Sequence, residues 1–136
     1  MNEIIKIKKY CSNKNIKFFL SNYFKIALKL RLDGVYLPSF NKDLRHLSYN
    51  IKSNFLIIGS AHNIKEIRIK EKQNVSLIFL SSIFKKNKNY LGIQKFKIFR
   101  SYTKKKVIAL GGISKLNVKK INLLSCAGFS GISYFE

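Results

Sequence analysis

Short apolar runs alternate with amphipathic segments along the whole chain. The apolar runs lack a regularly spaced polar side, which is typical of strands buried on both faces. The segments between them repeat apolar residues every three or four positions, which is typical of helices with one buried face. Strands are therefore expected at residues 16–20, 35–37, 55–59, 75–80, 107–110 and 131–135. Helices are expected at residues 2–11, 23–32, 43–51, 64–72, 92–102 and 116–124.

Strand and helix follow each other in units of roughly 20 to 25 residues, which favours a parallel sheet with right-handed crossovers. No linker or low-complexity tract divides the chain, so residues 1–136 are expected to form a single domain. Two architectures fit this pattern, a doubly wound open sheet and part of a (β/α)8 barrel. Both place ligand sites at the carboxyl ends of their strands. Polar residues and glycines gather at these ends: Ser21, Asn22, Ser39, Ser60, His62, Ser81, Ser82, Gly111 and Gly112.

The stretch from Val107 to Ile113 joins an apolar strand to the glycine pair Gly111-Gly112. Because glycine has no Cβ, it lets backbone N–H groups approach a bound group closely. A helix just beyond the pair would add partial positive charge from its first turn. Two interpretations stay open, namely an anion site, most simply for a phosphate, and a tight strand-to-helix turn without a ligand.

Lys and Arg number 27 whereas Asp and Glu number 6, so the net charge is +21 at neutral pH. Such a charge attracts nucleic acid, anionic membranes or acidic substrates non-specifically. However, the lysines are spread along the whole chain, beside many Asn and Ile residues that also have AT-rich codons. Compositional drift and solvated helix faces explain this spread better than a dedicated nucleic-acid surface does. A basic nucleic-acid-binding module is kept as an alternative function.

Cys11 and Cys126 are the only cysteines, and their wide separation forms neither a metal-ligand spacing nor a disulfide framework. Charged residues interrupt the N-terminal segment, so no signal peptide is expected. No apolar run approaches the ~18 residues of a membrane span. These features predict a reducing, cytoplasmic setting without membrane contact.

Five motifs share their order and spacing with a known protein family. They are DGVYL at 33–37, GSAHN at 59–63, LSSIF at 80–84, the strand with its glycine pair at 107–113, and GFSGI at 128–132. Over essentially all of its length the chain resembles the thiamine-phosphate synthase/TenI family. In that family the first four motifs end barrel strands four to seven, and the fifth approaches strand eight. The resemblance implies an incomplete TIM-type (β/α) barrel with about six parallel strands, lacking the first two strands.

The resemblance also implies a chemistry. Family synthases join an aminopyrimidine diphosphate to a thiazole phosphate and release diphosphate, while TenI-like members are thiazole tautomerases. Gly111 and Gly112 would bind the thiazole phosphate, and Ser60 would contact the diphosphate or the pyrimidine. His62 matches a catalytic histidine of the tautomerase branch, where imidazole suits general acid–base work near neutral pH. Helix capping or packing is the other interpretation of His62.

The diphosphate and metal end of the family site is expected to be weakened. The strand-two cations of the family have no counterpart, and its strand-three Asn-Asp pair reads Ser21-Asn22, which makes Asn22 a substrate contact by resemblance. Mg²⁺ serves the family, but Asn22 and Asn41 stand at its carboxylate positions, and amides replace carboxylates poorly. Lys88, in the lysine-rich loop 85–89, is the remaining diphosphate contact. The expected function is a thiamine-phosphate synthase-like protein, partly degenerate, with a TenI-like tautomerase as the alternative.

Six strands cannot close an eight-stranded barrel. Strands 16–20 and 131–135 would then be open parallel edges, which invite pairing with another chain. Three outcomes are considered, namely a truncated gene product, an open curved sheet, and a homo-oligomer joined at these edges. Phe129, Tyr134 and Phe135 are interface residues in the last case and ordinary core residues otherwise.

Overall fold

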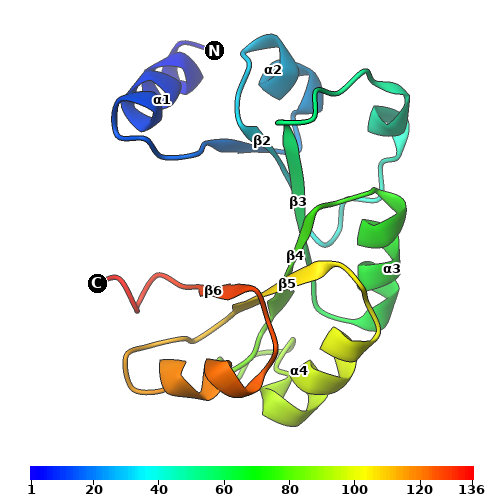
Figure 1. Cartoon of the computed structure of the whole chain (residues 1–136), viewed down its shortest axis with the longest axis vertical. Helices are drawn as coiled ribbons and strands as arrows, with labels where there is room; N and C mark the ends of the chain where they lie inside the picture. Colours follow the sequence, from blue (N-terminus) through cyan, green and yellow to red (C-terminus); the bar gives the residue numbers. More distant parts are fainter.

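The computed structural model describes residues 1–136 as a curved six-stranded sheet with helices along its outer side (Figure 1). The strands lie in chain order, and each neighbouring pair is parallel. The strands are β1 (Phe19–Ser21), β2 (Gly34–Leu37), β3 (Leu56–Ala61), β4 (Leu77–Ser81), β5 (Lys106–Leu110) and β6 (Gly128–Ser130). The α-helices are α1 (Asn2–Asn13), α2 (Phe24–Lys29), α3 (Ile64–Lys72) and α4 (Gly92–Ser101), and the 3-10 helices are η1 (Arg45–Ser48) and η2 (Val118–Leu123).

The expected alternation of six parallel strands with helices is confirmed. A doubly wound sheet reverses its strand order at a switch point, whereas the order here runs from β1 to β6 without reversal. The chain is therefore part of a barrel that curves in one direction. Figure 1 shows this curve as an open C, with the two chain termini on opposite arms.

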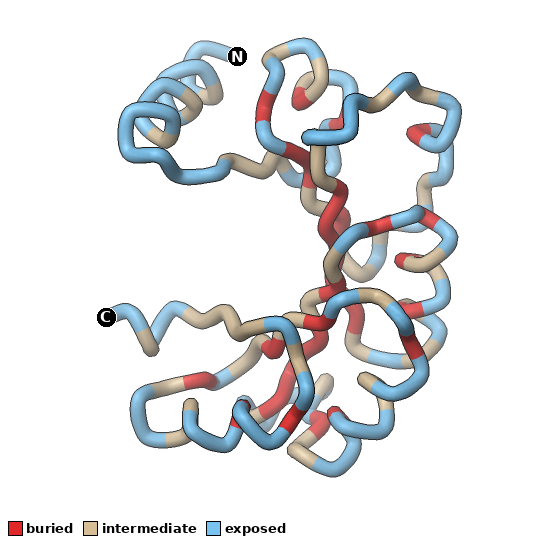
Figure 2. Tube along the Cα trace, in the orientation of Figure 1, coloured by how far each residue is buried: buried red, intermediate tan, exposed pale blue.

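The hydrophobic core lies between the outer face of the sheet and the helices. Every second strand residue contributes to it, including Val35, Leu37, Ile57, Ala61, Ile78, Leu80, Val107 and Ala109. Ile67 of α3 and Phe96 of α4 are fully buried against them. Figure 2 accordingly shows the buried residues concentrated along the strands and on the sheet side of the helices.

The inner face of the sheet is only partly buried. Phe19, Tyr36, Phe79 and Leu110 are half-exposed there. The prediction of strands buried on both faces is therefore right for the outer face and wrong for these inner positions. The physical reason is that six strands leave the curve open, so the inner side chains lack partners from an opposite wall.

Helix α3 has the bounds that the sequence predicts, residues 64–72. The side chain of Asn63 caps its first turn by accepting a hydrogen bond from the backbone N–H of Glu66 at 2.9 Å. Glu66 adds negative charge where the helix dipole is positive. None of the helices combines the length and the apolar character that crossing a membrane requires.

The expected α-helix at 43–51 is wrong, because only the 3-10 helix η1 forms there. The carboxylate of Asp43 accepts hydrogen bonds from the backbone N–H of Arg45 at 2.9 Å and from its guanidinium. The side chain of Asn41 likewise accepts from the backbone N–H of Asp43 at 2.9 Å. Such local side-chain bonds compete with helical backbone bonds and favour a turn.

The expected α-helix at 116–124 is also wrong, because the segment forms the 3-10 helix η2. Asn117 is the residue that organises its start. The Asn117 Oδ1 atom accepts from the Ser114 N–H at 2.9 Å, and its Nδ2 atom donates to the carbonyl of Gly112 at 2.8 Å. The polar side chain thus forms a turn where the apolar spacing alone predicts a helix.

The expected last strand at 131–135 is wrong, because β6 occupies Gly128–Ser130. Pairing with β5 begins earlier, since the Ala127 N–H donates to the Val107 carbonyl at 2.8 Å, and β6 ends at Ser130. The following residues form a turn. The aromatic rings of this turn and of β6 pack on one another. The ring centroid of Tyr134 lies 4.8 Å from that of Phe129 and 4.9 Å from that of Phe135. The aromatic pattern of this segment therefore reflects a local cluster, and its role in an interface stays a prediction.

Candidate functional site

The inner face of the sheet holds a cavity of about 350 Å³. Five of its residues are apolar or aromatic, and two serines add hydroxyl groups: Phe19, Tyr36, Ile58, Phe79, Leu110, Ser21 and Ser130. Together they come from all six strands. A concave apolar surface with a few polar groups suits a small aromatic molecule with polar substituents.

Gly111 and Gly112 follow β5 in backbone conformations that favour glycine, with φ angles of 111° and 71°. A Cβ on Gly111 would lie 2.8 Å from the Cα of Ser82. One on Gly112 would lie 2.7 Å from the backbone nitrogen of Lys85. Both contacts are with the loop after β4, so the absence of side chains lets these two loops pack together.

The backbone N–H groups of this turn have no partner. The Gly111 carbonyl accepts hydrogen bonds from the N–H groups of Phe84 at 2.9 Å and Lys85 at 3.2 Å. In contrast, the N–H groups of Gly111, Gly112 and Ile113 donate no hydrogen bond within the chain. Consecutive free N–H groups at a turn form a concave site for an anion.

The helix dipole expected beside this turn does not contribute to it. The segment after Gly112 is held by Asn117, and the short 3-10 helix η2 begins only at Val118. The dipole effect is confined to the first turn of a helix. The loop amides at the glycine pair are therefore available to an anion without the support of a helix dipole.

Ser60 and Tyr36 form a hydrogen-bonded pair on the inner face. The hydroxyl of Tyr36 donates to the Ser60 Oγ atom at 2.8 Å. Ser60 is buried, and the ring of Tyr36 packs edge-on against Phe79 at 6.3 Å between centroids. Tyr36 thereby sets the direction of the Ser60 hydroxyl, a contact between neighbouring strands that the sequence analysis missed.

His62 lies in the bend between β3 and α3, where the Glu66 carboxylate contacts both its backbone and its ring. The Glu66 Oε2 atom accepts from the His62 backbone N–H at 2.6 Å and lies 3.1 Å from the ring Nδ1 atom. A carboxylate at Nδ1 orients an imidazole and leaves Nε2 for proton transfer. The arrangement serves both interpretations of His62, because Glu66 also belongs to the capped first turn of α3.

The structure brings Asn22 and Asn41 together, with the Asn41 Nδ2 atom donating to the Asn22 Oδ1 atom at 2.8 Å. The other amide oxygen, Asn41 Oδ1, accepts from the Asp43 N–H and from Gln73 Nε2. Arg45 binds the nearby carboxylate of Asp43. Its hydrogen bonds to this carboxylate lower the pKa of Asp43 to about 2. Hydrogen-bonded amides do not fit Mg²⁺, which prefers free carboxylate oxygens.

Lys88 is exposed in the loop between β4 and α4, and it makes no hydrogen bond or ion pair within the chain. The loop itself is held at its base, where the Ser82 Oγ atom donates to the carbonyl of Lys85 at 2.9 Å. A diphosphate contact of Lys88 stays a prediction.

A buried lysine on α3 anchors the loop that carries Asn41. The Lys70 Nζ atom donates hydrogen bonds to the carbonyls of Pro38 at 2.8 Å and Asn41 at 2.9 Å, and to Gln73 Oε1 at 2.8 Å. Burial lowers the pKa of Lys70 to about 8, and the nearby Glu66 carboxylate opposes this shift. The sequence analysis predicted the helix at 64–72 but missed this anchor. The available signal was that Lys70 lies three residues after Ile67, on the face that meets the sheet.

The lowered pKa of Lys70 predicts a pH dependence of stability. Between about 8 and the ordinary value of 10.5, the unfolded chain binds this proton more tightly than the folded chain does. The free energy of unfolding is therefore expected to rise as the pH increases across this window. Urea denaturation at about pH 7.5 and about pH 9.5 measures the gain. The gain should be larger in the wild type than in Lys70→Met, which keeps every other titrating group, and equal gains would contradict the assignment to Lys70.

Comparison with known proteins places the chain in context. The family model described as thiamine monophosphate synthase matches residues 1–135. The thiamine-phosphate synthase of Prochlorococcus marinus subsp. pastoris is 31% identical over 125 residues, which are 89% of this chain and 36% of that protein. The thiamine-phosphate synthase of Methanococcus vannielii is 26% identical over 132 residues, which are 94% of this chain and 64% of that protein.

The solved structure of a thiamine phosphate pyrophosphorylase from Pyrococcus furiosus is similar in fold. The TM-score is 0.74 at 23% sequence identity, and the match covers 93% of this chain and 62% of that one. This likeness assigns the six strands to a TIM-type (β/α) fold. The chain spans less than two thirds of the length of each of these three relatives.

Proposed function

The chain belongs to the thiamine monophosphate synthase family, and on this basis we propose that it acts in thiamine biosynthesis and binds a thiazole phosphate. The observation that carries the proposal is the run of three free N–H groups from Gly111 to Ile113 beside the apolar inner face. A phosphate group needs several such donors, and an aromatic thiazole ring suits an apolar surface.

In the synthase reaction a ring nitrogen of the thiazole would bond to the methylene carbon of the aminopyrimidine, while the bond from that carbon to diphosphate breaks. In this proposal Gly111 and Gly112 hold the thiazole phosphate, while Ser60 and Asn22 contact the second substrate. Lys88 would neutralise part of the charge on the leaving diphosphate. The amide pair offers no place for Mg²⁺, so no step is assigned to that ion.

A thiazole tautomerase is the second candidate function, and the observation that favours it is the bond between His62 and Glu66. Tautomerisation moves a proton from one atom of the thiazole to another and needs neither diphosphate nor its cations. His62 would accept and return that proton through Nε2, while Glu66 holds the ring in place at Nδ1. This chemistry uses only residues that the chain contains.

Calorimetric titration with thiazole phosphate tests the proposed function. Wild-type protein is expected to bind the phosphate ester at least about tenfold more tightly than the dephosphorylated thiazole alcohol, a difference of about 1.4 kcal/mol. The alcohol is the matched control, because it keeps the ring and loses only the phosphate. Lack of binding heat with millimolar thiazole phosphate would overturn the proposal. A His62→Asn variant that binds normally but no longer interconverts thiazole tautomers would select the second candidate.

A further inference from the structure

The amide pair of Asn22 and Asn41 stands where the resemblance implies carboxylates. We propose that the Asn22 Nδ2 group binds an oxygen of the diphosphate substrate directly, with no Mg²⁺ between them. Asn41, Gln73 and Lys70 are the positioning residues that set the direction of this amide. The choice of diphosphate rests on the proposed function, whereas the direction of the amide follows from hydrogen bonds alone.

A chain of hydrogen bonds that sets this direction starts at Lys70. An ammonium group only donates, so the Gln73 atom 2.8 Å from Lys70 Nζ is the oxygen Oε1. The other end of the Gln73 amide is therefore the donor Nε2. It donates to Asn41 Oδ1 at 3.1 Å, and to the carbonyls of Asn41 at 3.1 Å and Asp43 at 3.0 Å. Lys70 and Gln73 are fully buried, so water does not compete for these bonds.

The orientation of Asn41 is fixed a second time from its own loop. The backbone N–H of Asp43, which only donates, lies 2.9 Å from Asn41 Oδ1. Two donors thus contact this oxygen, and Nδ2 is on the other side of the Asn41 amide. That Nδ2 atom donates to Asn22 Oδ1 at 2.8 Å. Asn22 consequently keeps its oxygen for Asn41 and presents its Nδ2 group to a ligand.

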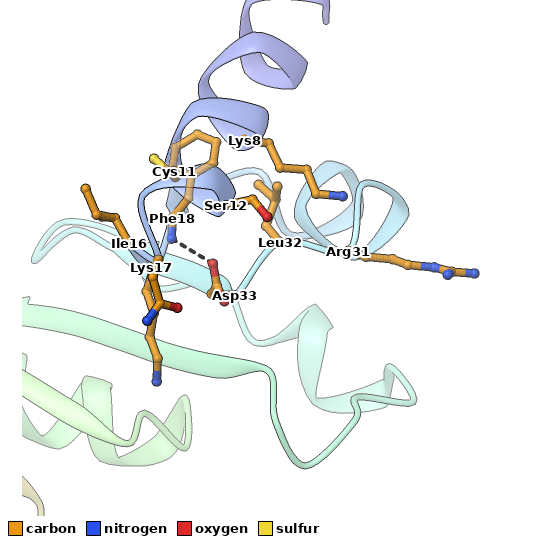
Figure 3. Close-up of a pocket in the computed structure, with 10 residues that line it drawn as sticks. Lys8, Cys11, Ser12, Ile16, Lys17, Phe18, Arg31, Leu32 and Asp33 are labelled. Carbon is orange, nitrogen blue, oxygen red and sulfur yellow. Dashed lines mark hydrogen bonds between the residues drawn. The ribbon is translucent and has the colours of Figure 1, made fainter.

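The backbone around Asn22 is also fixed. The Asn22 N–H donates to the carbonyl of Tyr36 at 2.9 Å, and its φ of 64° lies in the left-handed region, which asparagine tolerates. At the other end of β1, the Phe18 N–H donates to Asp33 Oδ2 at 2.8 Å (Figure 3). With β1 held against β2 at both ends, the remaining variable is the direction of the Asn22 amide, which Asn41 sets.

The Asn22 Nδ2 group is the free end of this hydrogen-bond chain. Its one contact within the chain is to Ser21 Oγ at 3.4 Å, longer than the roughly 2.7–3.2 Å of an ordinary hydrogen bond. The Asn22 side chain is exposed, so a ligand can reach it. A cation such as Mg²⁺ binds oxygen atoms and not N–H groups. The amide therefore suits an anionic oxygen.

A cavity of about 250 Å³ beside Asn22 has the charge that an anion needs. The basic residues Lys25 and Arg45 line it, and so does the carboxylate of Asp43. This carboxylate accepts a hydrogen bond from Arg45 Nε at 2.8 Å, so the two charges compensate each other. Lys25 leaves the cavity with one net positive charge, and diphosphate is attracted to it.

The positive charge of Lys70 strengthens the donor at the far end of the chain. A hydrogen bond from an ammonium group is stronger than one between neutral groups. Bonds in series polarise one another, so each amide that passes the bond on becomes a better donor. The buried lysine thereby supports anion binding at Asn22 without contacting the anion itself.

Calorimetric titration with inorganic diphosphate, in EDTA and in excess Mg²⁺, tests the proposal. Wild-type protein is expected to bind diphosphate in EDTA, and Mg²⁺ should not tighten the binding, because the ion competes for the same oxygens. Asn22→Asp keeps the size and tolerates the positive φ, but it replaces the donor by an acceptor. Its affinity in EDTA should be at least about tenfold lower. Asn54→Asp is the matched control, because it adds the same charge at an exposed position before β3, on the opposite edge of the sheet.

Asn41→Asp tests the positioning role. The carboxylate still accepts from Asp43 and Gln73 but has no N–H for Asn22, so the Asn22 amide turns and presents its oxygen. Diphosphate should then bind at least about tenfold more weakly in EDTA, although Asn22 is unchanged. The NMR signals of the Asn22 side-chain NH₂ group are expected to shift with diphosphate in the wild type and not in Asn41→Asp. A merely structural role of Asn41 would leave this difference out.

No binding heat with millimolar diphosphate in EDTA, or binding that needs Mg²⁺, would refute direct recognition by the amide. Equal affinity of the wild type and Asn22→Asp would also refute it, as would an equal loss in Asn54→Asp, which would assign the effect to net charge. These titrations contain no thiazole phosphate. A protein that binds thiazole phosphate but not diphosphate would keep the proposed function and lose only the role of Asn22, and the opposite result would do the reverse.

Discussion

Replacing Lys70 with alanine is expected to lower the free energy of unfolding by about 4 kcal/mol, a large share of the roughly 5–15 kcal/mol of a typical domain. The Lys70 side chain is fully buried, and its stem packs beside Gly59 on β3. Its ammonium group makes three hydrogen bonds, to Pro38, Asn41 and Gln73. Alanine leaves a cavity and removes the only partner of the Gln73 Oε1 atom. Urea denaturation measures the change.

Lys70→Met separates the two contributions. Methionine keeps most of the stem volume and loses the three hydrogen bonds, so the expected loss is about 2 kcal/mol. The matched control is Lys72→Ala on the same helix, where the exposed side chain should contribute no more than about 0.5 kcal/mol. If Lys70→Met unfolds at the same urea concentration as the wild type, the hydrogen bonds of the buried ammonium group make no net contribution to the free energy of unfolding.

The helix α3 shows why part of the fold could be predicted from sequence. Its bounds depend on residues that are close in the chain, namely the cap at Asn63 with Glu66 and the apolar side chain of Ile67. The strands were predictable for a similar reason, because the outer-face side chains form short apolar runs in each unit. Local signals of this kind also predict the parallel order, since each strand is followed by its own crossover.

The errors occur where a side chain bonds to the backbone or where distant segments meet. Asn41, Asp43 and Asn117 convert two apolar patterns into turns, and hydrophobic spacing does not record those bonds. The early start of β6 depends on the hydrogen bond from Ala127, just before β6, to Val107 on β5, and these two residues are far apart in the sequence. Neither effect is visible in a window of neighbouring residues.

The candidate site likewise has one part that the local sequence predicts and another part that only the fold brings together. The turn at Gly111 and Gly112 could be predicted from the sequence, because the glycine pair directly follows an apolar strand. Both residues do have positive φ angles. The contact between Asn22 and Asn41 and the anchor at Lys70 join β1, β2 and α3, and only the fold brings them together. The functional roles assigned to these residues by resemblance stay predictions.

Alanine at Gly112 is expected to weaken the binding of thiazole phosphate at least about tenfold. Its φ of 71° is unfavourable for alanine, and the new Cβ would lie 2.7 Å from the Lys85 nitrogen, so the loop must move. That movement displaces the free N–H groups that the phosphate needs. Gly128→Ala is the matched control, because its Cβ would meet only the Ile108 Cδ1 atom, at an ordinary 3.5 Å. Calorimetry on both variants tests this, and unchanged affinity in a folded Gly112→Ala protein would place the phosphate elsewhere.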